Sequence, residues 1–132
     1  MKLASRDRTV ICLTGDGSFI FAQPVPAIWA AATHQAPFLT VVFDNGGYRA
    51  MDSILDMMYG PGNYSSRLPN RVASRFVPPP DYAAIGRACG AWGETVEDPA
   101  AVRDTIRTGL QKAREGQPAI VTLKMARTGA SL

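Results

Sequence analysis

Two short polar loops contain the residues of this sequence that could do chemistry. The first loop (residues 15–19, GDGSF) and the second loop (residues 44–48, DNGGY) each follow a run of β-branched and aromatic residues. Such runs are typical of buried parallel strands, which deliver polar loops to the edge of a sheet. The loops offer the Asp16 carboxylate, the Asn45 amide oxygen and backbone carbonyls beside glycines. These ligands suit a Mg2+ ion that completes its octahedron with phosphate oxygens and water, so the sequence predicts a phosphorylated ligand.

The spacing of the two loops predicts that they meet. The stretch from Ser18 to Asp44 is about as long as one helical crossover and its return strand require. Two successive parallel strands would then end side by side. Ligands of open α/β sheets bind in the crevice outside such strand ends. We therefore expect Asp16 and Asn45 to converge on one point.

The hydrophobic pattern predicts an α/β fold with a mainly parallel sheet between helices. Expected strands cover residues 9–14, 38–43, 92–96 and 119–125, and expected helices cover 24–34, 51–59, 81–89 and 98–115. The first strand lacks polar alternation, which predicts that both of its faces are covered. Cys12 within this strand and Cys89 on a helix face are expected in the core, without a disulfide. Residues 126–132 are expected to form a frayed tail.

The segment between the second loop and residue 81 combines a helical stripe with a long irregular stretch. Apolar residues recur with helical spacing, which predicts a helix packed against the sheet, at Met51, Ile54, Leu55 and Met58. Residues 60–80 are rich in proline and glycine without periodicity and predict a long loop. Its arginines could meet a substrate carboxylate, although a solvated or partner-facing role is favoured; they are Arg67, Arg71 and Arg75.

Composition limits the classes of protein to which this chain can belong. The 132 residues are 46% hydrophobic and 19% charged, which is enough apolar material for one globular domain. The net charge is +3, and the sequence has neither a run of basic residues nor a known nucleic-acid recognition motif. Nucleic-acid binding is therefore not expected. No apolar run approaches the length of a membrane span, and the N-terminus is too polar for a signal peptide. A cytoplasmic location without membrane contact is expected.

The two loops, at this separation, resemble the cofactor motif of thiamine diphosphate-dependent enzymes. The similarity is to the branch of acetolactate synthase, benzoylformate decarboxylase and pyruvate decarboxylase. It extends over nearly the whole chain, because residues 81–90 (DYAAIGRACG) and 116–121 (GQPAIV) also resemble that branch. The resemblance implies the thiamine diphosphate-binding fold. Residues 1–132 would then form a single, partial C-terminal domain that binds the cofactor's diphosphate.

The resemblance also implies a set of site residues. Mg2+ would be bound by Asp16, Asn45 and the backbone carbonyl of Gly47. The cofactor would contact residues of both loops, namely Gly15, Asp16, Gly17, Ser18, Asn45, Gly47 and Tyr48. Asp44 departs from the family's usual Asn, and it either adds a charge near the metal or only caps the strand. Residues 51–59 would border the substrate, which is the alternative to packing against the sheet.

The implied enzyme is a 2-oxo acid decarboxylase or carboligase similar to acetolactate synthase. In the family, the glutamate that activates the cofactor lies on a different domain, usually of another subunit. This chain is therefore expected to be a truncated or separately encoded part, inactive alone, without a catalytic residue, and part of a homo- or hetero-oligomer. One face of this chain would then be covered by another chain. The candidates for that face are Met51, Met57, Met58, Tyr59 and Tyr64. The alternative is that all five pack into the chain's own core or under the long loop.

Two other classes of protein stay open at this stage. One is an α/β scaffold or subunit that has lost the cofactor, against which the intact Asp16, Asn45 and Gly47 argue. The other is an unrelated Mg2+-dependent phosphoryl enzyme, which is disfavoured because no Walker lysine motif is present.

Overall fold

The computed structural model describes residues 2–71 and 74–126 of the chain. Within these ranges the strands are β1 (Ile11–Gly15), β2 (Leu39–Asp44), β3 (Trp92–Val96) and β4 (Ala119–Lys124). The α-helices are α1 (Asp16–Phe21), α2 (Pro24–Thr33), α3 (Arg49–Tyr59), α4 (Tyr64–Arg67), α5 (Tyr82–Ala88) and α6 (Val102–Arg114). Short 3-10 helices are η1 (Lys2–Ala4), η2 (Pro69–Arg71) and η3 (Pro99–Ala101). This order of elements confirms the predicted α/β class.

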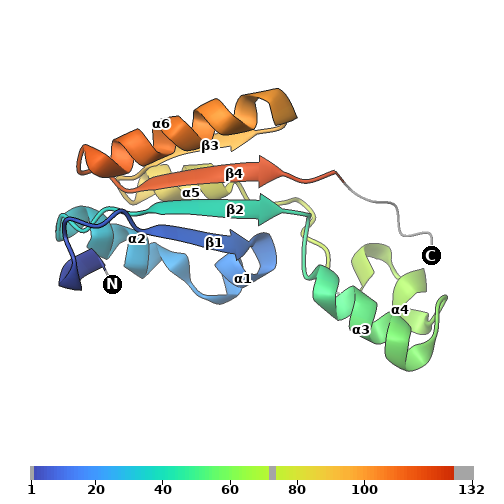
Figure 1. The fold of residues 1–132 in the computed structure, drawn as a ribbon. Helices are drawn as coiled ribbons and strands as arrows, with labels where there is room; N and C mark the ends of the chain where they lie inside the picture. Colours follow the sequence, from blue (N-terminus) through green and yellow to red (C-terminus); the bar gives the residue numbers. More distant parts are fainter. Residues whose placement is uncertain (1, 72–73, 127–132) are drawn as a thin grey trace.

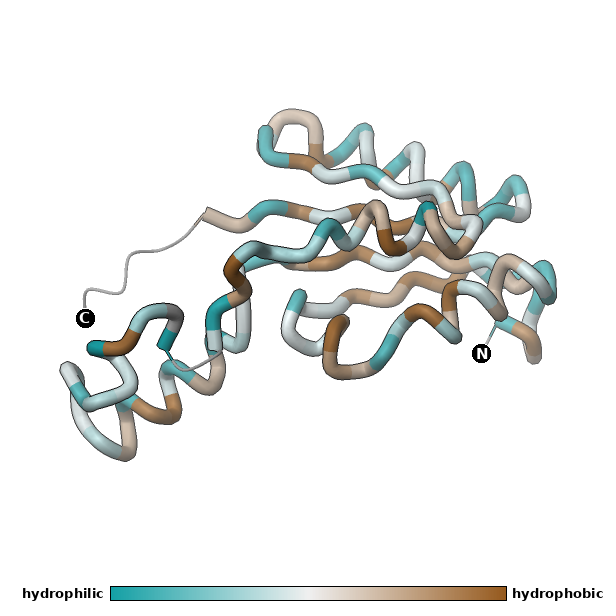
Figure 2. Tube along the Cα trace, turned by 180° about the vertical axis from the view of Figure 1, so that it is seen from behind, coloured by the Kyte–Doolittle hydropathy of each residue, from teal (hydrophilic) through white to brown (hydrophobic). Residues whose placement is uncertain are grey.

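The described strands form one parallel sheet in the order β1-β2-β4-β3, with helices on both faces (Figure 1). On one face, α6 packs Val102, Ile106 and Leu110 against the central strands. On the other face, α1, α2 and α5 contribute Phe19, Ile28 and Tyr82 to the core; these are buried against β2 and β4. Hydrophobic residues run along the strands, whereas α6 mixes hydrophilic and hydrophobic residues (Figure 2). Coverage of both faces explains why the central strands lack polar alternation.

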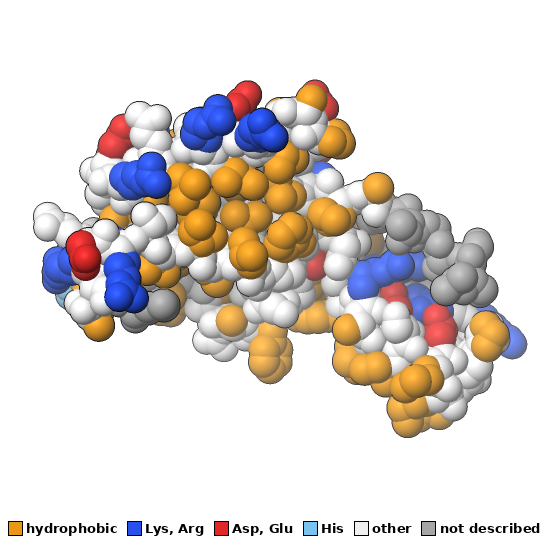
Figure 3. Space-filling view, in the orientation of Figure 1, with side chains coloured by type: hydrophobic (Ala, Val, Ile, Leu, Met, Phe, Trp, Pro, Cys, Tyr) orange, Lys and Arg blue, Asp and Glu red, His pale blue; other side chains and the backbone are white. Residues whose placement is uncertain are grey.

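The first strand departs from the prediction made from its sequence. It lies at the edge of the sheet, and the side chains of Ile11 and Leu13 are 49% and 66% exposed. Cys12 is exposed as well. The expectation that both faces of this strand are covered, with Cys12 in the core, is therefore wrong. For Ile11 and Leu13 the reason is that α6 packs over β2, β3 and β4, so hydrophobic side chains are left uncovered on the sheet below it (Figure 3).

The connection from β1 to β2 contains a helix that the sequence analysis did not predict. α1 begins at Asp16 in the first loop, so the polar residues of that loop lie in its first turn. Gln23 has a left-handed backbone (φ 51°) after the end of α1, and Pro24 then begins α2. Proline suits a first helical turn because its missing N–H is not needed there. The predicted helix over residues 24–34 is confirmed as α2.

Residues 49–71 and 74–76 belong to a lobe that extends away from the sheet beyond the C-terminal end of β2 (Figure 1). Its helix α3 confirms the predicted helical stripe, but the expected packing of that stripe against the sheet is wrong. Met51, Ile54 and Met58 are 50%, 41% and 64% exposed. The chain leaves the sheet through the two glycines of the second loop, whose positive φ angles permit a backbone path that other residues rarely adopt.

The long segment predicted as a loop contains α4 and η2, and it buries Arg71 within the lobe. One guanidinium nitrogen of Arg71 lies 2.8 Å from a carboxylate oxygen of Asp56, and another lies 3.4 Å from one of Asp52. The hydrogen bond from Arg71 is the main cause that lowers the pKa of Asp56. The interpretation of Arg71 as solvated is therefore wrong, because its side chain is buried against two carboxylates of the lobe.

The second half of the chain follows the sequence prediction closely. Asp81 Oδ1 accepts a 2.9 Å hydrogen bond from the N–H of Ala84 and caps α5, at the residue where this helix was expected to begin. Cys89 packs half-buried against the core, and both cysteines are free. Apart from Ala126, the predicted frayed tail lies outside the described residues. None of the helices in the described part of the chain has the length and hydrophobicity that a membrane span needs.

The buried hydroxyl of Tyr82 leads to a prediction about stability. Tyr82 is 1% exposed, its ring packs edge-on against Phe19 at 5.5 Å, and no described residue bonds to its hydroxyl. Burial is the main cause that raises the pKa of this phenol. An unpartnered buried hydroxyl costs free energy, so Tyr82→Phe should raise the free energy of unfolding by about 1 kcal/mol. Urea denaturation measures this, with Tyr59→Phe at an exposed site as the control; a destabilised Tyr82→Phe would contradict it.

Candidate functional site

The two polar loops lie next to each other at the C-terminal edge of the sheet. β1 and β2 are adjacent and parallel, and their last paired residues are Gly15 and Phe43. Asp16 follows β1 directly and is 1% exposed, while Asn45 follows β2 and is half-buried. The predicted meeting of the two strand ends is therefore present, in the position where open α/β sheets place their ligands.

The carboxylate of Asp16 ties the two loops together. Its Oδ1 accepts a hydrogen bond from the N–H of Gly17 at 2.8 Å. Its Oδ2 accepts two more from the second loop, from the N–H groups of Gly46 and Gly47, both at 2.8 Å. A carboxylate has about four lone-pair positions, so one position remains for a further ligand. Asp16 thus fixes the relative placement of the two loops.

The electrostatic surroundings of Asp16 favour a bound cation. Burial raises the pKa of this carboxyl, and the nearby Asp44 raises it further, against the lowering effect of the three backbone N–H donors. The net effect is a raised pKa, so ionisation of Asp16 costs free energy in the metal-free site. A cation beside the carboxylate would offset that cost, because an opposite charge stabilises the ionised form.

The oxygens beside Asp16 fit Mg2+. Asn45 Oδ1 is buried, and no described residue donates a hydrogen bond to it. The carbonyl of Gly47 accepts one hydrogen bond, from the N–H of Arg49 at 3.0 Å, which leaves its second lone pair available. The described residues contain no cluster of three or more His, Cys, Asp or Glu side chains suited to a metal. The two loops therefore offer one carboxylate, one amide oxygen and one carbonyl. Such a small set of protein ligands suits Mg2+ when phosphate oxygens and water complete its coordination shell.

Two glycines allow the close contacts within the site. A Cβ atom at Gly17 would lie 2.7 Å from the ring of Tyr48. One at Gly47 would lie 2.1 Å from the carbonyl oxygen of Ser74, and Gly47 also has a positive φ of 146°. The ring of Tyr48 packs edge-on against Phe76 at 5.0 Å, and its N–H donates to the Ser74 carbonyl at 2.7 Å. Residues 74–76, where the chain returns from the lobe, thus pack against the second loop.

The structure answers the question of what Asp44 does. Its Oδ2 lies 2.5 Å from Nζ of Lys124, and its Oδ1 accepts a 3.0 Å hydrogen bond from the N–H of Gly46. Asp44 therefore caps the second loop and carries a charge that is already paired. The sequence analysis missed Lys124 as part of this site because 80 positions separate it from its partner.

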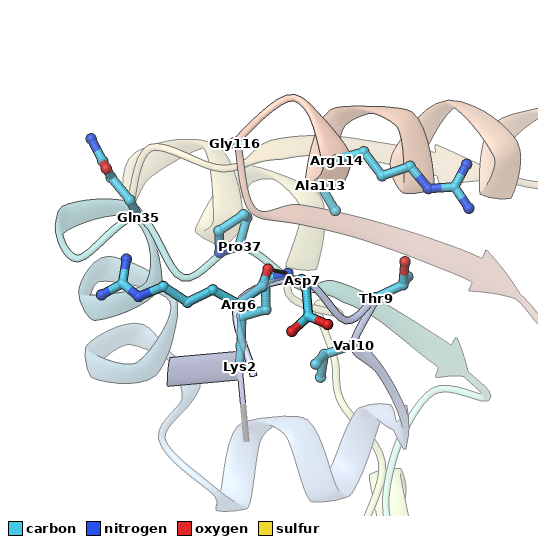
Figure 4. Close-up of a pocket in the computed structure, with 10 residues that line it drawn as sticks. All are labelled: Lys2, Arg6, Asp7, Thr9, Val10, Gln35, Pro37, Ala113, Arg114 and Gly116. Atoms are coloured by element: carbon cyan, nitrogen blue, oxygen red, sulfur yellow. Dashed lines mark hydrogen bonds between the residues drawn. The ribbon is translucent and has the colours of Figure 1, made fainter. Parts of the chain in front are cut away.

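A separate pocket of about 280 Å3 lies at the opposite end of the sheet (Figure 4). Thr9, Pro37 and Gly116, which precede β1, β2 and β4, are among its lining residues. Lys2 also lines it, but its Nζ donates to the backbone carbonyl of Arg6 at 2.6 Å. This pocket is remote from Asp16 and Asn45 and does not contribute to the site.

The sequence of this chain is similar to sequences of known proteins. Residues 1–123 match the sequence model of the family described as thiamine pyrophosphate enzyme, C-terminal TPP binding domain. The 3D-(3,5/4)-trihydroxycyclohexane-1,2-dione hydrolase of Bacillus licheniformis is 32% identical over 91 residues. These residues are 69% of this chain and 14% of the hydrolase.

Two solved enzymes share the fold. The thiamine diphosphate-dependent 4-hydroxybenzoylformate decarboxylase of Rhodococcus jostii RHA1 is 24% identical, with a TM-score of 0.70 over 94% of this chain. The benzoylformate decarboxylase of Polynucleobacter necessarius is 23% identical, with a TM-score of 0.71 over 99% of this chain. The chain spans only 21% and 22% of these enzymes. It belongs to the family of C-terminal thiamine pyrophosphate-binding domains of thiamine pyrophosphate enzymes, whose cofactor is usually bound with Mg2+.

Proposed function

We propose that this chain binds the diphosphate of thiamine diphosphate through a Mg2+ ion held by Asp16, Asn45 and the carbonyl of Gly47. The observation that carries this proposal is the buried Asn45 Oδ1, which no described residue bonds, beside a buried carboxylate on the neighbouring strand end. A buried acceptor without a donor is costly, and a metal ion would remove that cost. The remaining cofactor contacts would come from Gly15, Gly17, Ser18 and Tyr48.

The residues of this chain would bind and orient the cofactor rather than transfer protons. Asp16 holds both loops in place through backbone N–H groups, so the metal ligands are positioned before the cofactor arrives. When bound, thiamine diphosphate would supply a nucleophilic carbon for the reaction of a 2-oxo acid. We assign no catalytic residue to this chain. The cofactor-activating glutamate would come from a second domain or subunit.

The activity of the whole protein is a further part of the proposal. This chain spans 14% to 22% of the three relatives described above. We infer that it is the diphosphate-binding part of a 2-oxo acid decarboxylase or carboligase similar to acetolactate synthase. The isolated 132-residue chain should then show no turnover of pyruvate or benzoylformate with thiamine diphosphate and Mg2+.

Isothermal titration calorimetry tests the binding proposal directly. Thiamine diphosphate with Mg2+ should bind, whereas thiamine with Mg2+ should not, because thiamine lacks the diphosphate that meets the metal. ADP with Mg2+ is the comparison for an unrelated phosphoryl enzyme. Equal binding of both diphosphates would favour a generic diphosphate site. No binding of any of these ligands would favour a scaffold that has lost the cofactor.

The lobe offers the surface through which we propose this chain meets a second chain. The expectation that its methionines and tyrosines pack into the core is wrong, since all are at least half exposed: Met51 50%, Met57 79%, Met58 64%, Tyr59 67% and Tyr64 76%. Met and Tyr are frequent in the cores of interfaces. The lobe lies beside the C-terminal edge of the sheet that carries the site (Figure 1).

Light scattering at micromolar concentration should show association of this chain with itself. The double variant Met57→Lys/Met58→Lys should be monomeric, because burial of the lobe surface in an interface would desolvate two charges. A matched control is Leu3→Lys, at a 61% exposed site in η1, outside the lobe. A monodisperse wild-type monomer, with the lobe nevertheless protected from hydrogen exchange, would contradict this part of the proposal.

A further inference from the structure

Asp44 and Lys124 form an ion pair beside the site that the family resemblance does not predict. The side chain of Asp44 is 2% exposed and that of Lys124 is 35% exposed, with Nζ and Oδ2 2.5 Å apart. The two residues face each other across the paired ends of β2 and β4. The backbone repeats this connection, since the N–H of Met125 donates to the Asp44 carbonyl at 2.8 Å. The end of β4 is therefore joined to the start of the second loop.

The two carboxylates of the site share one donor. The N–H of Gly46 donates to Asp16 Oδ2 at 2.8 Å and to Asp44 Oδ1 at 3.0 Å. Two like charges that share one N–H donor repel each other. Among the described residues, Lys124 is the cation paired with either of them. Without Lys124 the site would hold two negative charges where a diphosphate has to approach.

We propose that Lys124 is a positioning residue that neutralises Asp44, so that the site meets the diphosphate with the single negative charge of Asp16. This inference rests on the proposed function. An Asn at position 44 would leave the same net charge without any lysine. The opposite charges of Asp44 and Lys124 therefore cancel each other beside the site. Lys124 acts through Asp44, and we assign it no contact with the cofactor.

Two roles of the Asp44–Lys124 pair, neutralising charge or only holding the strand end, predict different affinities for the same variants. Lys124→Met leaves Asp44 unpaired and the site more negative. Thiamine diphosphate at saturating Mg2+ should then bind about tenfold more weakly, whereas Mg2+ alone should bind at least as tightly as in the wild-type chain. If the pair only held the strand end in place, both affinities should fall together.

The test uses calorimetric titration of Mg2+ alone, and of thiamine diphosphate at saturating Mg2+, into four forms of the 132-residue chain. These are wild type, Lys124→Met, Asp44→Asn, and Asp44→Asn/Lys124→Met. The double variant removes both charges, so it avoids the unfolding that a buried unpaired carboxylate can cause. It should restore thiamine diphosphate affinity to within about threefold of wild type. Lys112→Met removes a lysine of α6 that is as exposed as Lys124, breaks its ion pair with Glu115 and should change neither affinity.

The results separate failure of this inference from failure of the proposed function. If the wild-type chain does not bind thiamine diphosphate with Mg2+, the proposed function is wrong and this inference falls with it. If the wild-type chain binds but the double variant stays as weak as Lys124→Met, only the inference is overturned. A parallel loss of Mg2+ and thiamine diphosphate affinity in Lys124→Met would overturn it as well.

Discussion

Asp16→Asn should weaken binding of thiamine diphosphate with Mg2+ by at least about a hundredfold. The substitution removes the single unpaired negative charge that would meet the metal. It also removes an acceptor, because an amide offers one oxygen where the carboxylate offers two. Whichever way the new amide turns, its NH2 group faces backbone N–H groups of Gly17 or of the second loop. The two loops should then separate even in the absence of ligand.

Calorimetry measures the loss of affinity, and the amide chemical shifts of Gly46 and Gly47 report the loops without any ligand. Asp81→Asn is the matched control, because Asp81 caps α5 and Asn caps a helix equally well. It should change neither the binding of thiamine diphosphate nor these chemical shifts. Wild-type affinity in Asp16→Asn would remove Asp16 from the metal site and contradict the proposed function.

Arg71→Met should unfold the lobe while leaving the sheet intact. Asp52 has a side chain only 8% exposed, and its carboxylate would keep the hydroxyl of Ser74 as a partner but lose the guanidinium. A buried carboxylate deprived of its cation destabilises its surroundings by about 3 kcal/mol. Arg71 also has a left-handed backbone (φ 44°), a strained conformation that its contacts with the carboxylates hold in place. The loss should remain local, because the lobe lies apart from the sheet (Figure 1).

Hydrogen exchange should show faster exchange over residues 49–71 of Arg71→Met and unchanged exchange in β2 and β4. The pKa of Asp56 gives a second readout. Arg71 lowers this pKa, so in the wild-type chain the ionised Asp56 stabilises the folded state at pH values above 3.8, the ordinary pKa of the group. This stabilisation is lost as the pH falls through the lowered folded-state pKa. In Arg71→Met the pKa should return towards 3.8. Arg67→Met, at an exposed site in the same lobe, is the control. Unchanged exchange in Arg71→Met would show that the ion pairs do not hold the lobe.

The local features of this chain could be predicted from the order of its residues. Asp81 and Asp98 both cap the helical segments that they were expected to begin. The two polar loops follow two adjacent parallel strands because a crossover of that length returns the chain to the same edge. α1 was missed because a glycine-containing stretch of six residues has little helical signal of its own. Its formation depends on burial of Phe19 in the core.

By itself the sequence determined the fold class, the strands, the longer helices and the placement of Asp16 and Asn45 at neighbouring strand ends. Each of these depends on residue types and spacing within one or two elements. Only the tertiary structure decided that β1 lies at an edge with Leu13 exposed, and that Lys124 pairs with Asp44 across 80 positions. The sequence of an apolar strand is the same whether or not a helix covers it, so its exposure cannot be predicted from the strand alone. Which charges neutralise each other depends on which strands become neighbours, and that is settled only when the sheet assembles.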